Sequence, residues 1–315
     1  MRDPEAFATS LLAMLGQRDP EQARAVAVAV RTALAEASPE ALRAFFDALE
    51  SAGRDWGYEP ASAFARGLSR VVLRHMFEPG SGLEVGANLS TTPHRPVLLL
   101  GNHLSFVDAN VLELLLADAG HTELAERLTV VVGPKVYTRP LRRVASLCFG
   151  TVKTPQSASR ASGDARMSPR EVARIALKSL SAARERLVLG DALLIFVEGT
   201  RSRTAAMQRA LAGIARYLEQ TDALVVPFGV AGTEHLTPIG ENERLERAQV
   251  VARFGAPLPA ARVVERCARK RALVMDVIGF LIADCLPESY RGCYGFAGGE
   301  LAEAHAVAAE LARAS

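Results

Sequence analysis

A histidine and an aspartate lie five residues apart, directly after an apolar run of the sequence. The run 96–100 ends in Gly-Asn-His, which places an imidazole at His103, and Asp108 immediately precedes an apolar helical pattern. A carboxylate beside an imidazole fixes which ring nitrogen carries the proton, and a neutral imidazole is suited to act as a general base near pH 7. The spacing therefore predicts a strand, a short loop and a helix start that together hold a His–Asp pair for proton transfer.

A second group of side chains that could do chemistry follows another apolar run. The run 192–197 reads ALLIFV, and the stretch after it reads EGTRSR, with Glu198, Gly199, Arg201 and Arg203. Gly199 permits a tight turn at the strand end, so the two arginines would project into the crevice where α/β sheets bind ligands. Guanidinium groups bind phosphate through paired hydrogen bonds. The stretch therefore indicates an anion site, and two solvated arginines in a loop are the alternative interpretation.

Composition and charge restrict the class of protein. The 315 residues suit one large or two modest domains, and 49% hydrophobic with 23% charged residues favours an ordinary globular core. The net charge of +2 argues against a general nucleic-acid binder. Four cysteines without CxxC spacing, and the lack of a Cys/His set at zinc-site spacing, predict reduced thiols in a cytoplasmic protein and no metal site.

Two features of the sequence bear on membrane contact. The N-terminus has Asp3 and Glu5 where a signal peptide would have basic residues, and no apolar run reaches the ~18–20 residues that cross a bilayer. The predicted helix 61–76 carries Arg66, Arg70 and Arg74 beside an apolar stripe. Either this helix packs on the main domain, which we favour, or it rests on anionic lipid as a peripheral contact on the inner face of the membrane.

The elements that position these groups alternate along the chain after residue 96. We expect an N-terminal helical segment, 1–80, and an α/β domain, 81–315, whose mostly parallel or mixed central sheet is covered by helices. Helix starts are indicated by Asp-Pro at 19–20 and by Ser-Pro at 38–39 and 168–169. The expected strands are 97–100, 128–132, 192–197, 224–230 and 249–254, and the expected helices are 109–119, 168–189, 205–219 and 263–285. Residues 77–95 are predicted to be a connector, and 154–168 a polar loop.

Three blocks of this sequence occur in the order and at the approximate spacing of a known family. They are N-H-x4-D at 102–108, F-x-E-G-x-R-S at 196–202 and a Val-Pro pair at 226–227. In these blocks the chain resembles the superfamily of glycerol-3-phosphate and 1-acylglycerol-3-phosphate O-acyltransferases, over about residues 96–260.

The resemblance implies a transferase of EC class 2.3.1 in phospholipid biosynthesis. Such an enzyme moves a fatty acyl group from acyl-CoA or acyl carrier protein to a hydroxyl of glycerol 3-phosphate or a related phosphorylated acceptor. His103 would be the general base, and Asp108 would fix its tautomer and orientation. The acceptor hydroxyl attacks the thioester directly, so neither a cofactor nor a protein nucleophile is needed. Backbone N–H groups near the loop would stabilise the oxyanion.

The remaining site residues are expected to bind the acceptor. Arg201 would bind its phosphate, Arg203 would assist, and Glu198 would support either the acceptor or the loop by hydrogen bonding. The complete predicted stretch is Glu198, Gly199, Thr200, Arg201, Ser202 and Arg203. Lys153 is the preferred extra phosphate contact, followed by Lys135 and then by Arg142 and Arg143. For each of these four, an ordinary surface charge is the alternative.

Two features of the sequence favour a small acceptor over a lysophospholipid. The N-terminal segment lacks the hydrophobic helix pair of many lysophosphatidate acyltransferases, and the Arg-Ser-Arg form at 201–203 resembles members that act on glycerol 3-phosphate. A 1-acylglycerol-3-phosphate acyltransferase is the alternative, as are a thioesterase-like hydrolase using water in the same site and a non-catalytic lipid- or carrier-binding protein. We expect His103 and Arg201 to face one cavity, and His103→Ala or Asp108→Ala to abolish thiol release while leaving the fold intact.

Overall fold

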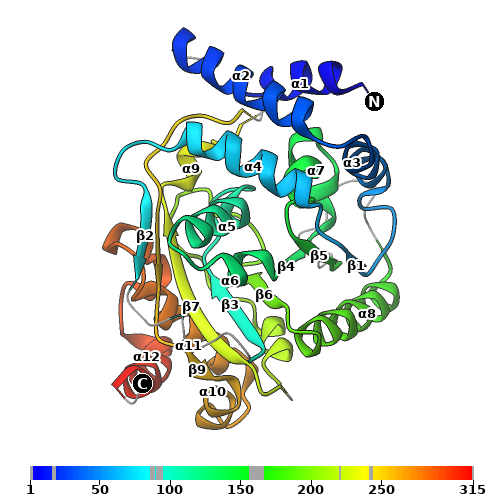
Figure 1. Cartoon of the computed structure of the whole chain (residues 1–315). Helices are drawn as coiled ribbons and strands as arrows, with labels where there is room; N and C mark the ends of the chain where they lie inside the picture. The colour runs from blue at the N-terminus through cyan, green and yellow to red at the C-terminus, as the bar shows by residue number, and fades with distance from the viewer. Residues whose placement is uncertain are drawn as a thin grey trace.

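One mixed β-sheet forms the centre of the protein, and helices cover both of its faces (Figure 1). The computed structural model describes residues 3–15, 19–85, 89, 95–155, 167–219, 221–240 and 244–313. The strand order is β1-β5-β4-β6-β3-β7-β8-β2, and β9 pairs with β7. The predicted α/β class with a mixed central sheet is therefore confirmed.

The bounds of the elements are as follows. The strands are β1 Tyr58–Glu59, β2 Gly82–Val85, β3 Val97–Gly101, β4 Leu128–Val132, β5 Gly150–Lys153, β6 Ala192–Phe196, β7 Leu224–Ala231, β8 Val251–Phe254 and β9 Leu258–Pro259. The α-helices are α1 Pro4–Leu12, α2 Pro20–Glu36, α3 Pro39–Ser51, α4 Ala63–Met76, α5 Asp108–Asp118, α6 Thr122–Glu126, α7 Pro140–Ser146, α8 Pro169–Val188, α9 Thr233–Leu236, α10 Ala260–Arg266, α11 Arg271–Ala283 and α12 Ala302–Arg313. Short 3-10 helices include η2 Pro134–Tyr137, η4 Ala212–Tyr217 and η5 Glu288–Tyr290.

Five neighbouring strands at the centre of the sheet, β5, β4, β6, β3 and β7, run parallel. Their residues are almost all buried because helices cover both faces, which explains why these strands read as continuous apolar runs. At the two sides, β8 runs antiparallel to β7 and β1 runs antiparallel to β5. The carboxyl ends of the five parallel strands therefore meet at one edge of the sheet, where ligands bind in folds of this kind.

The two faces of β3 contact two different clusters of buried side chains. Val97 and Leu99 belong to one cluster, and Leu98 and Leu100 belong to the other, because alternate strand residues point to opposite faces. The first cluster includes side chains of α1, α2 and α3, such as Phe45. The second includes side chains of α8, α10, α11 and α12. The division of the chain into 1–80 and 81–315 stays a prediction.

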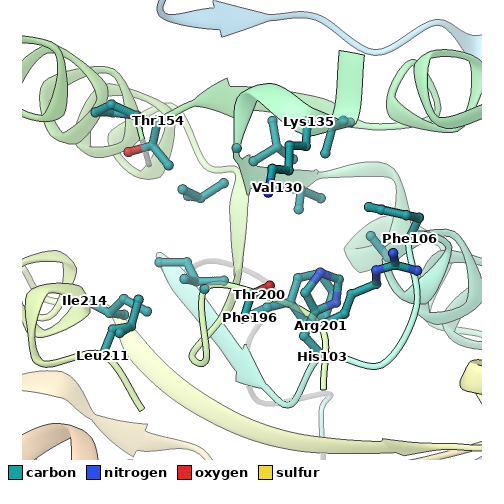
Figure 2. A pocket seen from close by; sticks show the side chains of 18 of the residues that line it. His103, Phe106, Val130, Lys135, Thr154, Phe196, Thr200, Arg201, Leu211 and Ile214 are labelled. Atoms are coloured by element: carbon teal, nitrogen blue, oxygen red, sulfur yellow. The ribbon is translucent and has the colours of Figure 1, made fainter. Parts of the chain in front are cut away.

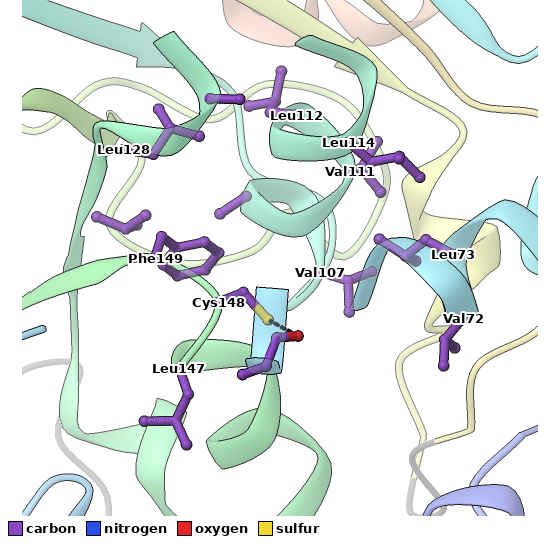
Figure 3. Close-up of a cluster of buried hydrophobic side chains, with 14 of the residues drawn as sticks. Val72, Leu73, Val107, Val111, Leu112, Leu114, Leu128, Leu147, Cys148 and Phe149 are labelled. Carbon is purple, nitrogen blue, oxygen red and sulfur yellow. Dashed lines mark hydrogen bonds between the residues drawn. The ribbon is translucent and has the colours of Figure 1, made fainter. Parts of the chain in front are cut away.

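Helix α5 is buried along most of its length. Every residue from Asp108 to Leu116 is buried, and Figure 3 shows Val111, Leu112 and Leu114 among side chains of α4, β4 and residues 147–149. In the same cluster the Sγ of Cys148 donates to the carbonyl oxygen of Ala65 at 3.4 Å. A helix that is packed on all sides holds the residue at its first position, Asp108, in a fixed place.

Helix α4 packs on the main domain, as we favoured. Its arginines pair with acidic side chains of α5: Arg70 Nη2 lies 2.5 Å from Glu113 Oε1, and Arg74 Nη2 lies 2.5 Å from Asp118 Oδ1. Arg66 Nε lies 3.7 Å from the same Glu113. These charges therefore hold α4 against α5. Within the described residues, no helix combines the length and the apolar character that crossing a bilayer requires.

The predicted helix starts before residues 20, 39 and 169 are confirmed. Asp19, Ser38 and Ser168 each accept a hydrogen bond from a backbone N–H in the first turn of the helix that follows. Each is followed by a proline. Proline lacks an N–H, but this costs nothing at the first helical position, because an N–H there would have no acceptor within the helix. The two longest helices, α2 and α8, thus begin where the sequence predicts.

The stretch 205–219 is not the predicted helix. Ala205 has a φ of +62°, and only the 3-10 helix η4 forms within the stretch. Four of its backbone N–H groups bond to distant acceptors instead of to carbonyls within a helix. Met207 donates to Tyr290 O, Gln208 to Glu198 Oε2, Ala210 to Tyr294 Oη and Leu211 to Val197 O.

Two further predictions are wrong in part. The expected helix 263–285 is divided between α10 and α11, because Ala268 and Arg269 have positive φ angles of +48° and +59°. The expected connector 77–95 contains β2, which pairs in parallel with β8. Residues 86–88 and 90–94 of that connector and residues 156–166 of the expected polar loop lie outside the described residues.

Candidate active site

Asn102 fixes the point at which the chain leaves β3. This buried side chain donates from Nδ2 to the carbonyl oxygen of Val230 at 2.9 Å, and its Oδ1 accepts the N–H of Val230 at 2.8 Å. The amide thus takes the place of a backbone pair and extends the β3–β7 ladder by one position. The next residue, His103, starts the loop 103–107 with its position set by the sheet.

His103 and Asp108 form the predicted pair. The Nδ1 of His103 lies 2.8 Å from Oδ2 of Asp108. An ionised carboxylate only accepts hydrogen bonds, so Nδ1 carries the proton and Nε2 keeps a free lone pair for a substrate. The ring of Phe196 stacks on the imidazole, with centroids 4.2 Å apart and planes 13° apart. The imidazole is therefore held by a hydrogen bond in its plane and by an aromatic ring on its face.

Asp108 is surrounded by hydrogen-bond donors. Its Oδ2 also accepts the backbone N–H groups of Leu104 at 2.7 Å and Ser105 at 2.9 Å, and its Oδ1 accepts the hydroxyl of Thr233 at 2.6 Å. The carboxylate is fully buried and lies at the N-terminal end of α5, where the helix dipole favours a negative charge. It is thus the centre around which the loop is folded.

The second sequence block is bonded to the backbone of His103 on both sides. Glu198 Oε1 accepts the N–H of His103 at 2.9 Å, and the N–H of Ser202 donates to the carbonyl oxygen of His103 at 2.8 Å. Gly199 makes the turn between them with a φ of +64°. Glu198 is fully buried, and its Oε2 accepts the N–H of Gln208 at 2.8 Å. Of the two roles expected for Glu198, the contacts correspond to support of the loop.

Two arginines stack on the ring of Phe106. The Cζ of Arg201 lies 3.4 Å and the Cζ of Arg142 lies 3.3 Å from the ring centroid. Two guanidinium groups at such distances cannot share one face, so the ring lies between them. Burial lowers the pKa of Arg201 to about 10, and burial together with the charges of Arg201 and Arg139 lowers the pKa of Arg142 to about 10. The two charges are therefore held close together at an energetic cost.

A cavity of about 630 Å³ brings the two sequence blocks together. His103, Phe106 and Arg201 lie at one end of it, and Leu211 and Ile214 lie at the other (Figure 2). Side chains of β4, β6, α8 and η4 make most of the remaining wall apolar. Its cationic lining residues are Lys135, Arg142, Arg201, Arg203 and Arg216, and within the described part of the chain no Asp or Glu lines it. The cavity thus combines a base, a cationic region and an apolar region.

Apart from Lys153, the predicted catalytic residues and the predicted stretch with Lys135 fall into two groups. His103, Lys135, Gly199, Thr200, Arg201 and Arg203 line the cavity. Asp108, Glu198 and Ser202 are buried behind it and bond to His103 or its loop. Among the described residues, no group of three or more His, Cys, Asp and Glu side chains is placed to hold a metal ion, and a reaction without metal stays a prediction.

Two predicted phosphate contacts do not line the cavity: Arg143, whose Nη2 donates to the carbonyl oxygen of Tyr137 at 2.9 Å, and Lys153. The Nζ of Lys153 donates to the carbonyl oxygen of Gly53 and lies 4.4 Å from the ring centroid of Trp56 and 5.5 Å from that of Tyr137. Burial lowers the pKa of Lys153. The sequence could not reveal this, because the covering residues come from the segment before β1, about a hundred residues away. Lys153 joins that segment to β5 and is separate from the cavity.

Replacing Lys153 with alanine is therefore expected to destabilise the fold and to leave acceptor binding unchanged. The variant loses a buried hydrogen bond and a cation–π contact, which together correspond to about 2–3 kcal/mol in the free energy of unfolding. Urea denaturation and the KM for a phosphorylated acceptor measure the two effects. The exposed Lys135, which lines the cavity, is the matched control: Lys135→Ala should raise KM and preserve stability. A raised KM with unchanged stability in Lys153→Ala would contradict this placement.

Several contributing residues were not predicted from the sequence. Phe196 and Asn102 lie inside the recognised blocks but had no assigned role, and Phe106 lies between His103 and Asp108. Thr233 lies just after β7, at the same edge of the sheet. The sequence could have indicated Thr233, because residues that follow neighbouring parallel strands gather at one edge of the sheet.

One comparison with known proteins, that with protein families, agrees with the resemblance. Residues 84–231 match the family model named Acyltransferase. No curated protein matches the sequence. Among solved structures, the chain is similar to the crystal structure of the 1-acyl-sn-glycerophosphate (LPA) acyltransferase PlsC from Thermotoga maritima. The identity is 15% and the TM-score 0.44, over 80% of this chain and 84% of that chain.

Proposed function

Because residues 84–231 form an acyltransferase domain of the glycerophosphate acyltransferase superfamily, we propose which reaction the cavity carries out. The protein transfers a fatty acyl group from acyl-CoA or acyl carrier protein to a hydroxyl of glycerol 3-phosphate or a related phosphorylated acceptor. One observation carries this proposal: the available nitrogen of His103 and the guanidinium of Arg201 belong to one cavity that also has a long apolar wall.

His103 acts as the general base in this proposal. Its Nε2 takes the proton from the acceptor hydroxyl while the hydroxyl oxygen attacks the carbonyl carbon of the thioester. The tetrahedral intermediate then breaks its C–S bond, and the imidazolium returns the proton to the leaving sulfur. Asp108 keeps the proton of the neutral imidazole on Nδ1 and stabilises the imidazolium that forms.

The cationic region binds the phosphate of the acceptor. Arg201 directly precedes Ser202, whose N–H bonds to the backbone of His103, and a guanidinium that stacks on Phe106 can present its edge for paired hydrogen bonds to a phosphate. Arg203, Lys135 and Arg142 line the same cavity and add charge. No carboxylate is among the described lining residues, so the charged side chains on the cavity wall attract an anion.

The apolar region takes the acyl chain, and its length sets the preferred substrate. Ala176 of α8 lines this region, so Ala176→Phe fills part of it. We expect the preferred acyl chain to become shorter by about two to four carbon atoms, because the added ring occupies that length of chain. Competition among acyl-CoA substrates of different lengths measures the shift. Ser181→Phe, at an exposed position of the same helix outside the cavity, is the control and should keep the original preference. An unchanged preference in Ala176→Phe would place the acyl chain elsewhere.

Product analysis by mass spectrometry tests the proposed reaction. The purified protein is incubated with acyl-CoA and, in separate reactions, with glycerol 3-phosphate, 1-acylglycerol 3-phosphate and glycerol. We expect an acylated product from glycerol 3-phosphate and none from glycerol. Product from the 1-acyl acceptor alone would instead identify a lysophosphatidate acyltransferase, and thiol release without any acylated product would identify a thioesterase and overturn the proposal. Peripheral contact with an anionic membrane and a cytoplasmic location stay predictions from the sequence.

A further inference from the structure

The short helix α9 contacts the His103 loop through two hydroxyl groups. Thr233, at its first position, donates to Oδ1 of Asp108 at 2.6 Å, and the hydroxyl of Thr237, just after its end, bonds to the hydroxyl of Ser105. All four side chains are buried. Residues four apart lie on the same side of a helical turn, so one side of this turn is bonded to the loop at two points.

The turn that precedes α9 places Thr233 against Asp108. Gly232 has a φ of +87°, and a Cβ at this position would lie 2.0 Å from the carbonyl oxygen of Gln249. Only glycine fits a turn with this conformation and this close approach. On the other side of the helix, Tyr290 donates to Oε1 of Glu234 at 2.5 Å. Thus the turn and the neighbouring segment both fix α9 where Thr233 meets the carboxylate.

The two oxygens of Asp108 have different partners. Oδ2 accepts from His103 Nδ1 and from the N–H groups of Leu104 and Ser105. Among the described residues, the donor to Oδ1 is Thr233. With both oxygens bonded, the carboxylate cannot rotate about its Cβ–Cγ bond without breaking a buried hydrogen bond. Rotation is the motion that would take Oδ2 out of line with the imidazole.

We propose that Thr233 is a positioning residue of this site, whose hydroxyl holds the Asp108 carboxylate in the orientation that His103 requires. The inference rests on the proposed function, because it assigns a further residue to the same proton transfer. Thr233 acts through Asp108 and does not line the cavity. It is therefore expected to affect the chemical step and not the binding of substrates.

Two substitutions distinguish the effect of the Thr233 hydroxyl from the effect of the shape of its side chain. Thr233→Val keeps the shape and removes the donor, and Thr233→Ser keeps the donor. We expect Thr233→Val to lower kcat about 10- to 100-fold, as loss of a supporting hydrogen bond around a site often does, with KM unchanged for both substrates. Thr233→Ser should recover most of the lost activity.

Thr129 provides a matched control at the opposite end of the strands. It is also buried, and its hydroxyl also donates to a carboxylate, Asp191 Oδ2, at 2.5 Å. Thr129→Val should therefore lose a similar buried bond and keep kcat. Wild-type kcat in Thr233→Val would overturn the inference. So would equal losses in Thr233→Ser and Thr233→Val, because the hydroxyl would then not be the group that matters.

A proton NMR measurement tests the inference independently of activity. A proton shared between an imidazole Nδ1 and a carboxylate gives a resonance far downfield, and the one due to His103 is identified by its loss in His103→Ala. We expect this resonance to shift or broaden in Thr233→Val and to be preserved in Thr233→Ser and Thr129→Val. An unaltered resonance in Thr233→Val would overturn the inference. If the wild-type protein formed no acylated product, the proposed reaction would fail while this measurement would still decide the role of Thr233.

Discussion

Replacing His103 with alanine is expected to lower kcat for thiol release and acyl transfer by about three to four orders of magnitude. In the proposed reaction, the variant removes the group that takes the proton from the acceptor hydroxyl. Its fold should persist, because the backbone of His103 keeps its bonds to Glu198 and Ser202. A steady-state assay of free thiol, together with a thermal melt, measures both expectations.

A second histidine substitution controls for this result. His235 lies near the end of β7, has an exposed side chain and does not line the cavity. His235→Ala should therefore retain full activity in the same assay. Wild-type activity in His103→Ala would contradict the general-base role.

The structure changes the expectation for Asp108, for which the sequence predicted loss of activity without damage to the fold. Asp108→Ala leaves the N–H groups of Leu104 and Ser105 and the hydroxyl of Thr233 without their buried acceptor. Each such loss costs about 1–3 kcal/mol in the free energy of unfolding. We expect this variant to lose stability as well as activity, so His103→Ala is the cleaner test of the base.

Replacing Arg201 with alanine is expected to raise the KM for the phosphorylated acceptor about 100-fold, which corresponds to the loss of a paired, charge-assisted hydrogen bond to phosphate. The KM for the acyl donor should change much less. Arg201→Lys should recover only part of the affinity, because an ammonium group neither bonds phosphate in a paired geometry nor stacks as a plane on Phe106. Initial rates at varied acceptor concentration give these values. Arg31→Ala, which removes an exposed arginine of α2, should leave KM unchanged.

Binding of inorganic phosphate tests the role of Arg201 in phosphate binding without measuring catalysis. Burial lowers the pKa values of Arg201 and Arg142 to about 10, so both groups are charged at neutral pH. A phosphate that binds the folded protein raises its melting temperature. We expect a smaller rise for Arg201→Ala than for wild type. An equal rise would show that phosphate binds elsewhere.

The sequence predicted the parts of the site that depend on neighbours along the chain. The strand before His103, the helix that begins at Asp108 and the turn at Gly199 all follow from local patterns, because apolar runs and glycine act within a few residues. Parallel pairing of β3 with β6 then brings Gly101 opposite Phe196. This single register explains why two blocks so far apart in sequence meet at one cavity.

The predictions that failed depend on partners far away in the sequence. Residues 205–211 have a helical composition, but their N–H groups find acceptors on Glu198, Tyr290 and Tyr294, which no local pattern reveals. Lys153 is a charged residue at the end of a strand, which is typical of a surface position, yet the segment before β1 covers it. In both cases tertiary contacts overrode local preference.

The inward direction of the N–H groups in the His103 loop has a consequence for the charge that develops on the substrate. The N–H groups of His103, Leu104 and Ser105 bond to the carboxylates of Glu198 and Asp108. These three successive N–H groups hold the loop of His103 in place. None of them can also donate a hydrogen bond to a thioester oxygen. In the proposed reaction, the negative charge of the tetrahedral intermediate must therefore be stabilised by groups other than these three amides. If His103 is the base, positioning it and stabilising the oxyanion are therefore tasks of different backbone groups.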